Sequence, residues 1–271
     1  MRRIIILKYG ELWLKSRRTK KRFIKLLRRH LTSLFPKDIF YFKRDRVEVI
    51  TNNFDLMRFK YIPGIEYAHL CYKTSSIIDD IIAVVEKILN EEKLKFESFA
   101  VRCKRTGKHN FRSKDIEEIV GNLIKEKTHA KVDLNNPGFT LKIDIISNET
   151  YISLSSLECI GGLPYASEGI CKVNNPNNLF LIIELLKRGM YIENLPDKLR
   201  KYFPKIKEEL YQRQDFKVIV YDYTFEDINE ILNIKKERDL VLFPLIVYSK
   251  DEIERKNEII TKDIKNLFKS L

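Results

Sequence analysis

One segment, residues 19–35, combines an apolar stripe with a basic stripe, and this pattern limits the fold more than any other feature. At about 100° per residue, the apolar side chains fall on one side of a helix; they are Phe23, Ile24, Leu27, Leu31 and Leu34. The basic side chains on the opposite side are Arg18, Arg22, Lys25 and Arg29. We therefore predict a helix that packs on a sheet and presents its basic stripe to solvent.

The excess positive charge of the chain is concentrated at its start. Residues 1–60 hold 18 Lys and Arg against 5 Asp and Glu, and this balance of +13 equals the net charge of the whole chain. Such a concentrated charge is typical of a surface that binds a polyanion, because neutralised phosphates release their counterions. The alternative is a basic face that contacts only water.

The N-terminal pattern predicts a compact α+β unit in the order β-α-β-β-α. The expected strands are residues 3–8, 39–42 and 46–51, and the expected helices are residues 19–35 and 54–61. A second unit follows, with expected strands at residues 66–73, 98–104, 139–146 and 151–155 and helices at residues 77–92 and 114–127. Ser113 is the expected N-cap of the second of these helices.

The C-terminal part has a different character, because strands and helices alternate as in a parallel α/β sheet. The break at Gly161 and Gly162 marks the boundary before this part. Its expected helices are residues 179–188, 225–235 and 251–268, and its expected strands are residues 217–223 and 240–248.

Residues 101–113 form the densest chemical signal, a strand end and loop that lead into a helix N-terminus. The segment supplies cationic side chains for phosphates, a glycine for close backbone approach, and His109 and Phe111 for stacking on bases. The alternative is an ordinary charged loop in which Phe111 is buried.

The run 99–121, together with residues 131–137, resembles the THUMP domain, an RNA-binding module of tRNA-modifying enzymes. Residues 7–15 resemble the ferredoxin-like domain that precedes THUMP in tRNA 4-thiouridine synthetases, and residues 161–164 match that family's junction to its catalytic domain. The resemblance implies a ferredoxin-like domain (1–60), a THUMP domain (61–165) and a small α/β domain (166–271) with a mostly parallel sheet.

In that family the two N-terminal domains grip the acceptor stem and single-stranded 3′ end of tRNA. The resemblance therefore makes tRNA the expected partner of this chain. The residues predicted to bind RNA are Lys15, Arg18, Arg22, Lys25, Arg29, Arg102, Lys104, Arg105, Lys108, His109 and Arg112.

After the junction the sequence departs from the family, whose catalytic domain holds ATP phosphates on a pyrophosphate loop, S-G-G-x-D-S. Counting back from residues 187–189, which match the family's K-R-G, this loop falls on Val173 and the five residues Asn174, Asn175, Pro176, Asn177 and Asn178. Both glycines, the serine and the aspartate are replaced. Residues 243–246 and 250–253 resemble a late catalytic-domain segment. The stretch between Gly189 and this segment is roughly half the family's usual length.

Catalytic and metal-binding residues are not predicted. The cysteines, Cys71, Cys103, Cys159 and Cys171, lack a C-x-x-C pair, the histidines are scattered, and Cys103 shares the strand parity of Phe99 and Val101, which favours a core position. A persulfide role for Cys171 or Cys159 is the less favoured alternative. No cofactor is expected, with ATP only under an enzymatic interpretation.

These features favour a non-catalytic tRNA-binding protein that presents the acceptor end of tRNA to a separate thiolation enzyme. The second hypothesis is an active ATP-dependent tRNA sulfurtransferase that makes 4-thiouridine with an altered nucleotide site. A helper of RNA methylation ranks lowest, because no Gly-rich methyl-donor loop is present. The sequence leaves open whether the chain forms a homodimer. No apolar run reaches the length of a membrane span or signal peptide, so a cytoplasmic location is expected.

Overall fold

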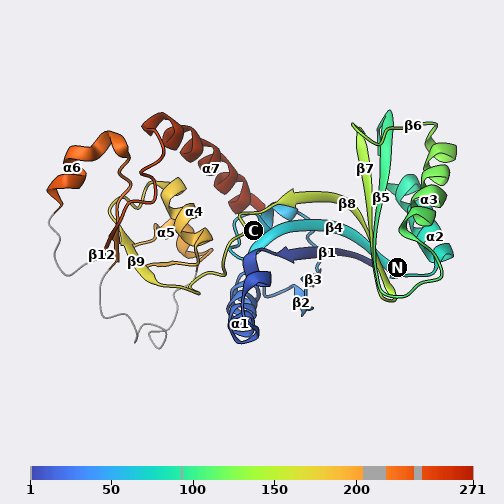
Figure 1. The fold of residues 1–271 in the computed structure, drawn as a ribbon, viewed down its shortest axis with the longest axis horizontal. Coiled ribbons are helices and arrows are strands. Elements are labelled where there is room, and N and C mark those ends of the chain that lie inside the picture. Colours follow the sequence, from blue (N-terminus) through green and yellow to red (C-terminus); the bar gives the residue numbers. More distant parts are fainter. Residues whose placement is uncertain (1, 93, 204–217, 235–239, 271) are drawn as a thin grey trace. The chain divides into compact units, whose positions relative to one another are not determined.

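The computed structural model describes residues 2–92, 94–203, 218–234 and 240–270 (Figure 1). The chain forms two compact units, the first of Met1–Ile6 with His69–Ser156 and the second of Leu7–Ala68 with Leu157–Leu271. Within the described residues, no helix has both the length and the apolar character needed to cross a bilayer. The predicted domain boundaries at residues 60 and 165 stay predictions.

The first unit is a mixed sheet with both of its helices on one face. Its strand order is β1-β4-β8-β7-β5-β6, with β5 and β7 parallel and β7 and β8 antiparallel. Figure 1 shows α2 and α3 on the same side of β5 and β7. The elements are β1 (Arg2–Tyr9), β4 (Ile65–Ser75), α2 (Ile78–Glu91), β5 (Ser98–Thr106), α3 (Ser113–Thr128), β6 (Lys131–Val132), β7 (Phe139–Ile146) and β8 (Glu149–Glu158).

Alternation along the strands of this unit produces its core. Val101 and Cys103 of β5 and Ile143 of β7 are buried in one cluster with Val84 of α2 and Val120 of α3. Because successive side chains of a strand point to opposite faces, the residues between these core positions point away from the helices. The core position predicted for Cys103 is confirmed, and so are the predicted strands and helices of this unit.

The N-cap prediction for α3 is wrong by one residue. Arg112 occupies the N-cap position, and its backbone N–H donates to the Asp115 carboxylate over 2.8 Å. Ser113 is the first helical residue. Asp115 therefore performs the reciprocal half of a capping box, which any N-cap residue can receive through its backbone.

The second unit begins with the end of β1 and the amphipathic helix α1 (Arg17–Leu34). The Ser16 hydroxyl caps α1 by accepting a hydrogen bond from the Thr19 N–H over 3.3 Å. A hairpin of β2 (Ile39–Phe42) and β3 (Arg46–Ile50) follows, as predicted. The predicted helix at 54–61 is only one 3-10 turn, η2 (Leu56–Phe59), because Pro63 and Gly64 follow too soon for a longer helix.

A small parallel sheet with the order β10-β9-β11-β12 completes the second unit, and its pairings confirm the parallel α/β prediction. Its strands are β9 (Ile170–Val173), β10 (Tyr191–Ile192), β11 (Val218–Val220) and β12 (Leu240–Leu242). The helical elements are η1 (Glu11–Leu14), near the start of the unit, and then α4 (Leu179–Lys187), α5 (Asp197–Arg200), η4 (Phe225–Asp227), α6 (Ile228–Asn233) and α7 (Lys250–Ser270). Residues 217 and 235, the ends of two predicted elements, lie outside the described residues.

The strand predicted at 240–248 ends early, at Leu242. Pro244 has no N–H to donate to a neighbouring strand. The chain turns instead, with the Ile246 N–H donating to the Phe243 carbonyl over 3.2 Å.

The predicted break before the C-terminal part contains Gly162, whose φ is +70°. A Cβ at this position would overlap the carbonyl oxygen of Lys187, so only glycine fits.

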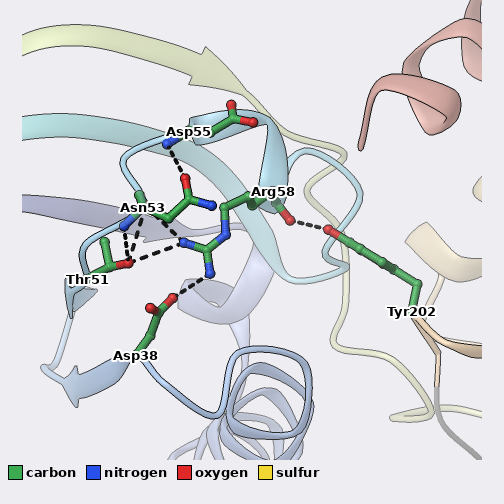
Figure 2. Close-up of polar contacts among 6 residues, drawn as sticks. All are labelled: Asp38, Thr51, Asn53, Asp55, Arg58 and Tyr202. Atoms are coloured by element: carbon green, nitrogen blue, oxygen red, sulfur yellow. Dashed lines mark hydrogen bonds and ion pairs between the residues drawn. The ribbon is translucent and has the colours of Figure 1, made fainter. Parts of the chain in front are cut away.

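A buried cluster around Arg58 joins distant parts of the second unit (Figure 2). The guanidinium donates to the Asp38 carboxylate over 2.7 Å and to the Asn53 carbonyl over 2.9 Å. The Tyr202 hydroxyl donates to the Arg58 carbonyl, and the Tyr202 carbonyl accepts from Nε2 of buried His30 over 2.8 Å. Burial lowers the pKa of His30 to about 4, so its imidazole is neutral near pH 7.

Candidate nucleic-acid interface

The exposed side of α1 carries the predicted basic stripe. Phe23, Leu27 and Leu31 are buried, whereas all four stripe residues, Arg18, Arg22, Lys25 and Arg29, are exposed. Lys15, just before the helix, is exposed as well. The helix therefore holds its cations toward solvent because its apolar stripe fixes its rotation.

Few of these cations are neutralised within the molecule. Arg22 lies 3.9 Å from the Glu168 carboxylate, and both side chains are well exposed, so this pair is weak. Its guanidinium also lies 5.0 Å from the centroid of the Phe23 ring. Among the described residues, Arg18, Lys25 and Arg29 have no ion-pair partner. The stripe is therefore available to an external anion.

Arg28 is a further exposed cation of α1, next to the predicted stripe and not among its four residues. Its guanidinium lies 4.6 Å from the centroid of the Phe42 ring, and the side chain is exposed. The ring of β2 orients this charge beside the stripe through a cation–π contact. Only the packing of α1 on the hairpin brings Arg28 and Phe42 together, so no local signal identified it.

In the first unit, several predicted RNA-binding residues at the end of β5 and in the loop before α3 bond to one another or to the protein. Arg105 donates to Nδ1 of His109 over 3.2 Å, and Nε2 of His109 donates to the Ser147 carbonyl over 2.6 Å. The ring centroids of His109 and Phe111 lie 5.2 Å apart, and Phe111 packs on the core. These two rings are therefore held by intramolecular contacts.

Arg112 is also paired, although its side chain is exposed. Its guanidinium donates to Asp115 Oδ1 from Nη2 over 2.9 Å. The hydrogen bonds from Arg112, the backbone one first, hold the pKa of Asp115 below its usual range. By contrast, Lys104 and Lys108 are exposed and have no ion-pair partner among the described residues.

The loop between β9 and α4 is a hydrogen-bonded cage around one carboxylate. Asp222 follows β11, and it accepts from the side-chain amides of Asn174 over 2.9 Å and Asn175 over 2.8 Å. The side-chain amide of Asn178 is within 3.4 Å of the same carboxylate, and its oxygen caps α4 by accepting from the Leu181 N–H. The side-chain amides of the loop are therefore satisfied by a carboxylate that follows β11.

Burial limits the reactivity of the cysteine thiols. All four cysteines are free and buried, and burial raises the pKa of the Cys103 thiol to about 11 and those of Cys159 and Cys171 to about 12. A thiol, rather than a nucleophilic thiolate, is the form expected near pH 7. In the described part of the chain, no group of His, Cys, Asp and Glu side chains is arranged to hold a metal ion.

Comparison with known protein families places this chain in the class of proteins that contain a THUMP domain. The family described as "THUMP domain" matches residues 75–155, all of which belong to the first unit. Two solved structures share the fold over nearly the whole chain. One is a 4-thiouridine synthetase–RNA complex with bound ATP, with a TM-score of 0.73, 20% identity, and coverage of 95% of this chain and 84% of that one.

The second solved structure is PH1313 from Pyrococcus horikoshii Ot3, with a TM-score of 0.70, 20% identity, and coverage of 96% of this chain and 100% of that one. In sequence, a probable tRNA sulfurtransferase of Methanocaldococcus jannaschii is 30% identical over 270 residues, covering 88% of this chain and 69% of the relative. This chain belongs to the tRNA sulfurtransferase family. It spans about half of another relative, the probable tRNA sulfurtransferase of Malacoplasma penetrans, to which it is 30% identical.

Proposed function

We propose that this chain binds tRNA at the acceptor stem and 3′ end and assists tRNA thiolation without activating a nucleotide itself. The observation that carries the binding half is the exposed stripe on α1, where Arg18, Lys25 and Arg29 are left without ion-pair partners among the described residues. Unpaired surface cations on a rigid helix suit a phosphate backbone, which supplies the missing negative charges.

The cage around Asp222 supports the non-catalytic half of the proposal. A loop that holds ATP phosphates needs free backbone N–H groups and a positive local potential. Here Pro176 lacks an N–H, asparagine amides donate to the protein's own carboxylate, and that carboxylate would repel a phosphate. The residues at this loop therefore do not fit the phosphates of ATP.

The accessory role implies a separate thiolation enzyme as the partner that receives the bound tRNA, in the cytoplasm. Family membership favours one alternative, an active ATP-dependent tRNA sulfurtransferase. The two readings differ in one property, because only an enzyme requires the loop at residues 174–178 for its activity.

Deletion of the gene in its host, followed by measurement of 4-thiouridine in bulk tRNA, tests the proposal. Loss of 4-thiouridine is expected on deletion, with restoration by the wild type. The loop variants Pro176→Ala and Asp222→Asn should also restore it, whereas a chain with alanine at Arg18, Lys25 and Arg29 should not. Unchanged 4-thiouridine in the deletion strain would overturn the thiolation role.

Calorimetry with ATP separates the accessory protein from the enzyme. We expect no saturable heat at micromolar concentrations, because the donors of the β9–α4 loop are already bonded to Asp222. Micromolar binding of ATP by the wild type would establish the enzymatic alternative instead.

A further inference from the structure

The sheet of the first unit has a second face, on the side away from α2 and α3 (Figure 1). Core residues Val101 and Cys103 point toward the helices, so Arg102 and Lys104 of β5 point away from them. On β7 the same alternation directs Lys142 away from the helices, because Leu141 and Ile143 lie in the core. Arg102, Lys104 and Lys142 are all exposed.

Strand register places two of these cations side by side. Arg102 of β5 is the partner of Lys142 on β7, and Lys142 is the partner of Ser153 on β8. The Ser153 hydroxyl in turn lies 3.3 Å from the Cys71 thiol of β4. This row across four strands, Arg102, Lys142, Ser153 and Cys71, contains two positive charges and no negative one.

The next row on the same face is balanced. Lys104 is the register partner of Asp144, which is in turn the partner of Tyr151. Lys73 pairs with the Glu149 carboxylate over 2.6 Å and lies 5.4 Å from the centroid of the Tyr151 ring. Acidic residues therefore accompany the cations in this row but not in the row of Arg102 and Lys142.

Like charges directly opposite each other on neighbouring strands destabilise a sheet. Arg102 donates to the Leu134 carbonyl, which orients its guanidinium but does not neutralise it. Lys142 has no ion-pair partner among the described residues. A shared external anion would remove the repulsion between the two side chains, which lie on strands about 4.8 Å apart.

We propose that the face of the sheet around Arg102 and Lys142 binds the phosphate backbone of the RNA. This inference rests on the proposed tRNA binding and adds a contact surface to it, with Lys142 as a new contact residue. Hydroxyl and cationic groups are the usual ligands of nucleic-acid phosphates, and Ser153 supplies a hydroxyl beside Lys142.

The same face is unsuited to reading bases. Sheet surfaces that bind single-stranded RNA by stacking present exposed aromatic rings. On this face Tyr151 is only 3% exposed, and Lys73 lies over its ring. The contact is therefore made to the backbone and does not depend on the RNA sequence.

Titration of tRNA with the Lys142→Gln variant, over a range of salt concentrations, tests the inference. Loss of one phosphate contact should weaken binding several-fold and reduce the slope of log K against log salt by about 1. The matched control is Lys125→Gln, which removes an exposed lysine from α3, on the helix side of the same unit. The control should bind as the wild type does.

A charge reversal gives a second measurement that is independent of partial unfolding. Lys142→Glu places opposite charges on neighbouring strands, so its melting temperature should equal or exceed that of the wild type. Its affinity for tRNA should nevertheless fall below that of Lys142→Gln. A folded Lys142→Glu with wild-type affinity would overturn the inference.

The outcomes distinguish this inference from the proposed function. If the wild type binds tRNA and Lys142→Gln matches the Lys125→Gln control, only the sheet-face contact is wrong. If the wild type does not bind tRNA at all, both proposals fall. An equal loss for tRNA and for an unrelated RNA stem would support a backbone contact, whereas a loss for one sequence alone would contradict it.

Discussion

The exposed stripe of α1 and the loop between β9 and α4 are both rich in hydrogen-bond donors, but they use them in opposite ways. On α1, the cationic groups of Arg18, Lys25 and Arg29 are turned to solvent without ion-pair partners among the described residues. In the loop, the amides of Asn174 and Asn175 bond to the carboxylate of Asp222.

The difference teaches that donor content alone does not identify a phosphate site. An external phosphate gains most where the donors have no competing partner, because each bond then replaces only water. The carboxylate of Asp222, beside the loop, satisfies the loop's amide donors and adds a negative charge. The first arrangement suits binding of a polyanion, and the second suits a rigid connection between strands.

The largest expected effect concerns Arg58, a basic residue that is buried and paired. Its side chain and that of Asp38 are each 7% exposed. Arg58→Ala leaves the Asp38 charge buried without its partner, so the free energy of unfolding should fall by about 3–5 kcal/mol. Chemical denaturation measures this change.

A double variant tests whether the loss of stability comes from breaking the ion pair between Arg58 and Asp38. Replacing both residues, as in Arg58→Met with Asp38→Leu, should cost less than Arg58→Ala alone, because no buried charge is left unpaired. Arg18→Ala on α1 should leave the unfolding midpoint unchanged. If Arg58→Ala were as stable as Arg18→Ala, burial would not be what separates structural from available cations.

The second prediction removes the α1 stripe. Alanine at all four positions, Arg18, Arg22, Lys25 and Arg29, should weaken tRNA binding on the order of 100-fold at low salt and lower the salt slope by about 3 to 4. The reason is that each exposed side chain can replace one counterion, since the single ion pair among them, Arg22 with Glu168, is weak. Filter binding or fluorescence anisotropy at several salt concentrations measures both quantities.

A variant of equal charge provides the control for the α1 stripe. It removes four exposed cations from the C-terminal part of the second unit, Lys198, Arg255, Lys262 and Lys265. This variant should lose much less affinity, because only a long-range charge effect remains. Equal losses in the two variants would show that net charge, rather than the α1 surface, governs binding.

A third, smaller effect is expected at the end of β5 and in the loop that follows it. Replacing Arg105 and Lys108 with alanine should weaken binding about tenfold for tRNA with an intact 3′ end and less for tRNA with a truncated end. Because Arg105 also orients His109, the single variant Lys108→Ala should show the same preference more weakly. Equal losses for the two RNAs would contradict contact with the 3′ end.

The smallest effect is expected for Asp222, which follows β11 and accepts hydrogen bonds from the loop between β9 and α4. Asp222→Ala removes the acceptor shared by three asparagine amides, but the site is partly exposed, so the free energy of unfolding should fall by only about 1–2 kcal/mol. tRNA affinity should be unchanged. A gain of ATP binding in this variant would show that the carboxylate alone had blocked a nucleotide site.

Long periodic segments of the sequence were sufficient to predict α1, α3 and β7, because burial of one face is encoded within each segment. Boundaries were less predictable where one residue competes with the pattern. Pro244 ended a strand that its apolar neighbours favoured, and Asp115 moved the N-cap of α3 from Ser113 to Arg112. The sequence also located the cationic residues of α1 on one side of the helix.

By itself, then, the sequence determined the amphipathic elements, the concentration of positive charge and the family resemblance, since each is written in local spacing or composition. Tertiary structure decided which polar groups are satisfied. Asp222 lies 48 residues from Asn174, and Lys142 lies 40 residues from its neighbour Arg102 on the sheet. Only strand pairing brings such residues together, and pairing is determined by packing of the whole sheet rather than by any local pattern.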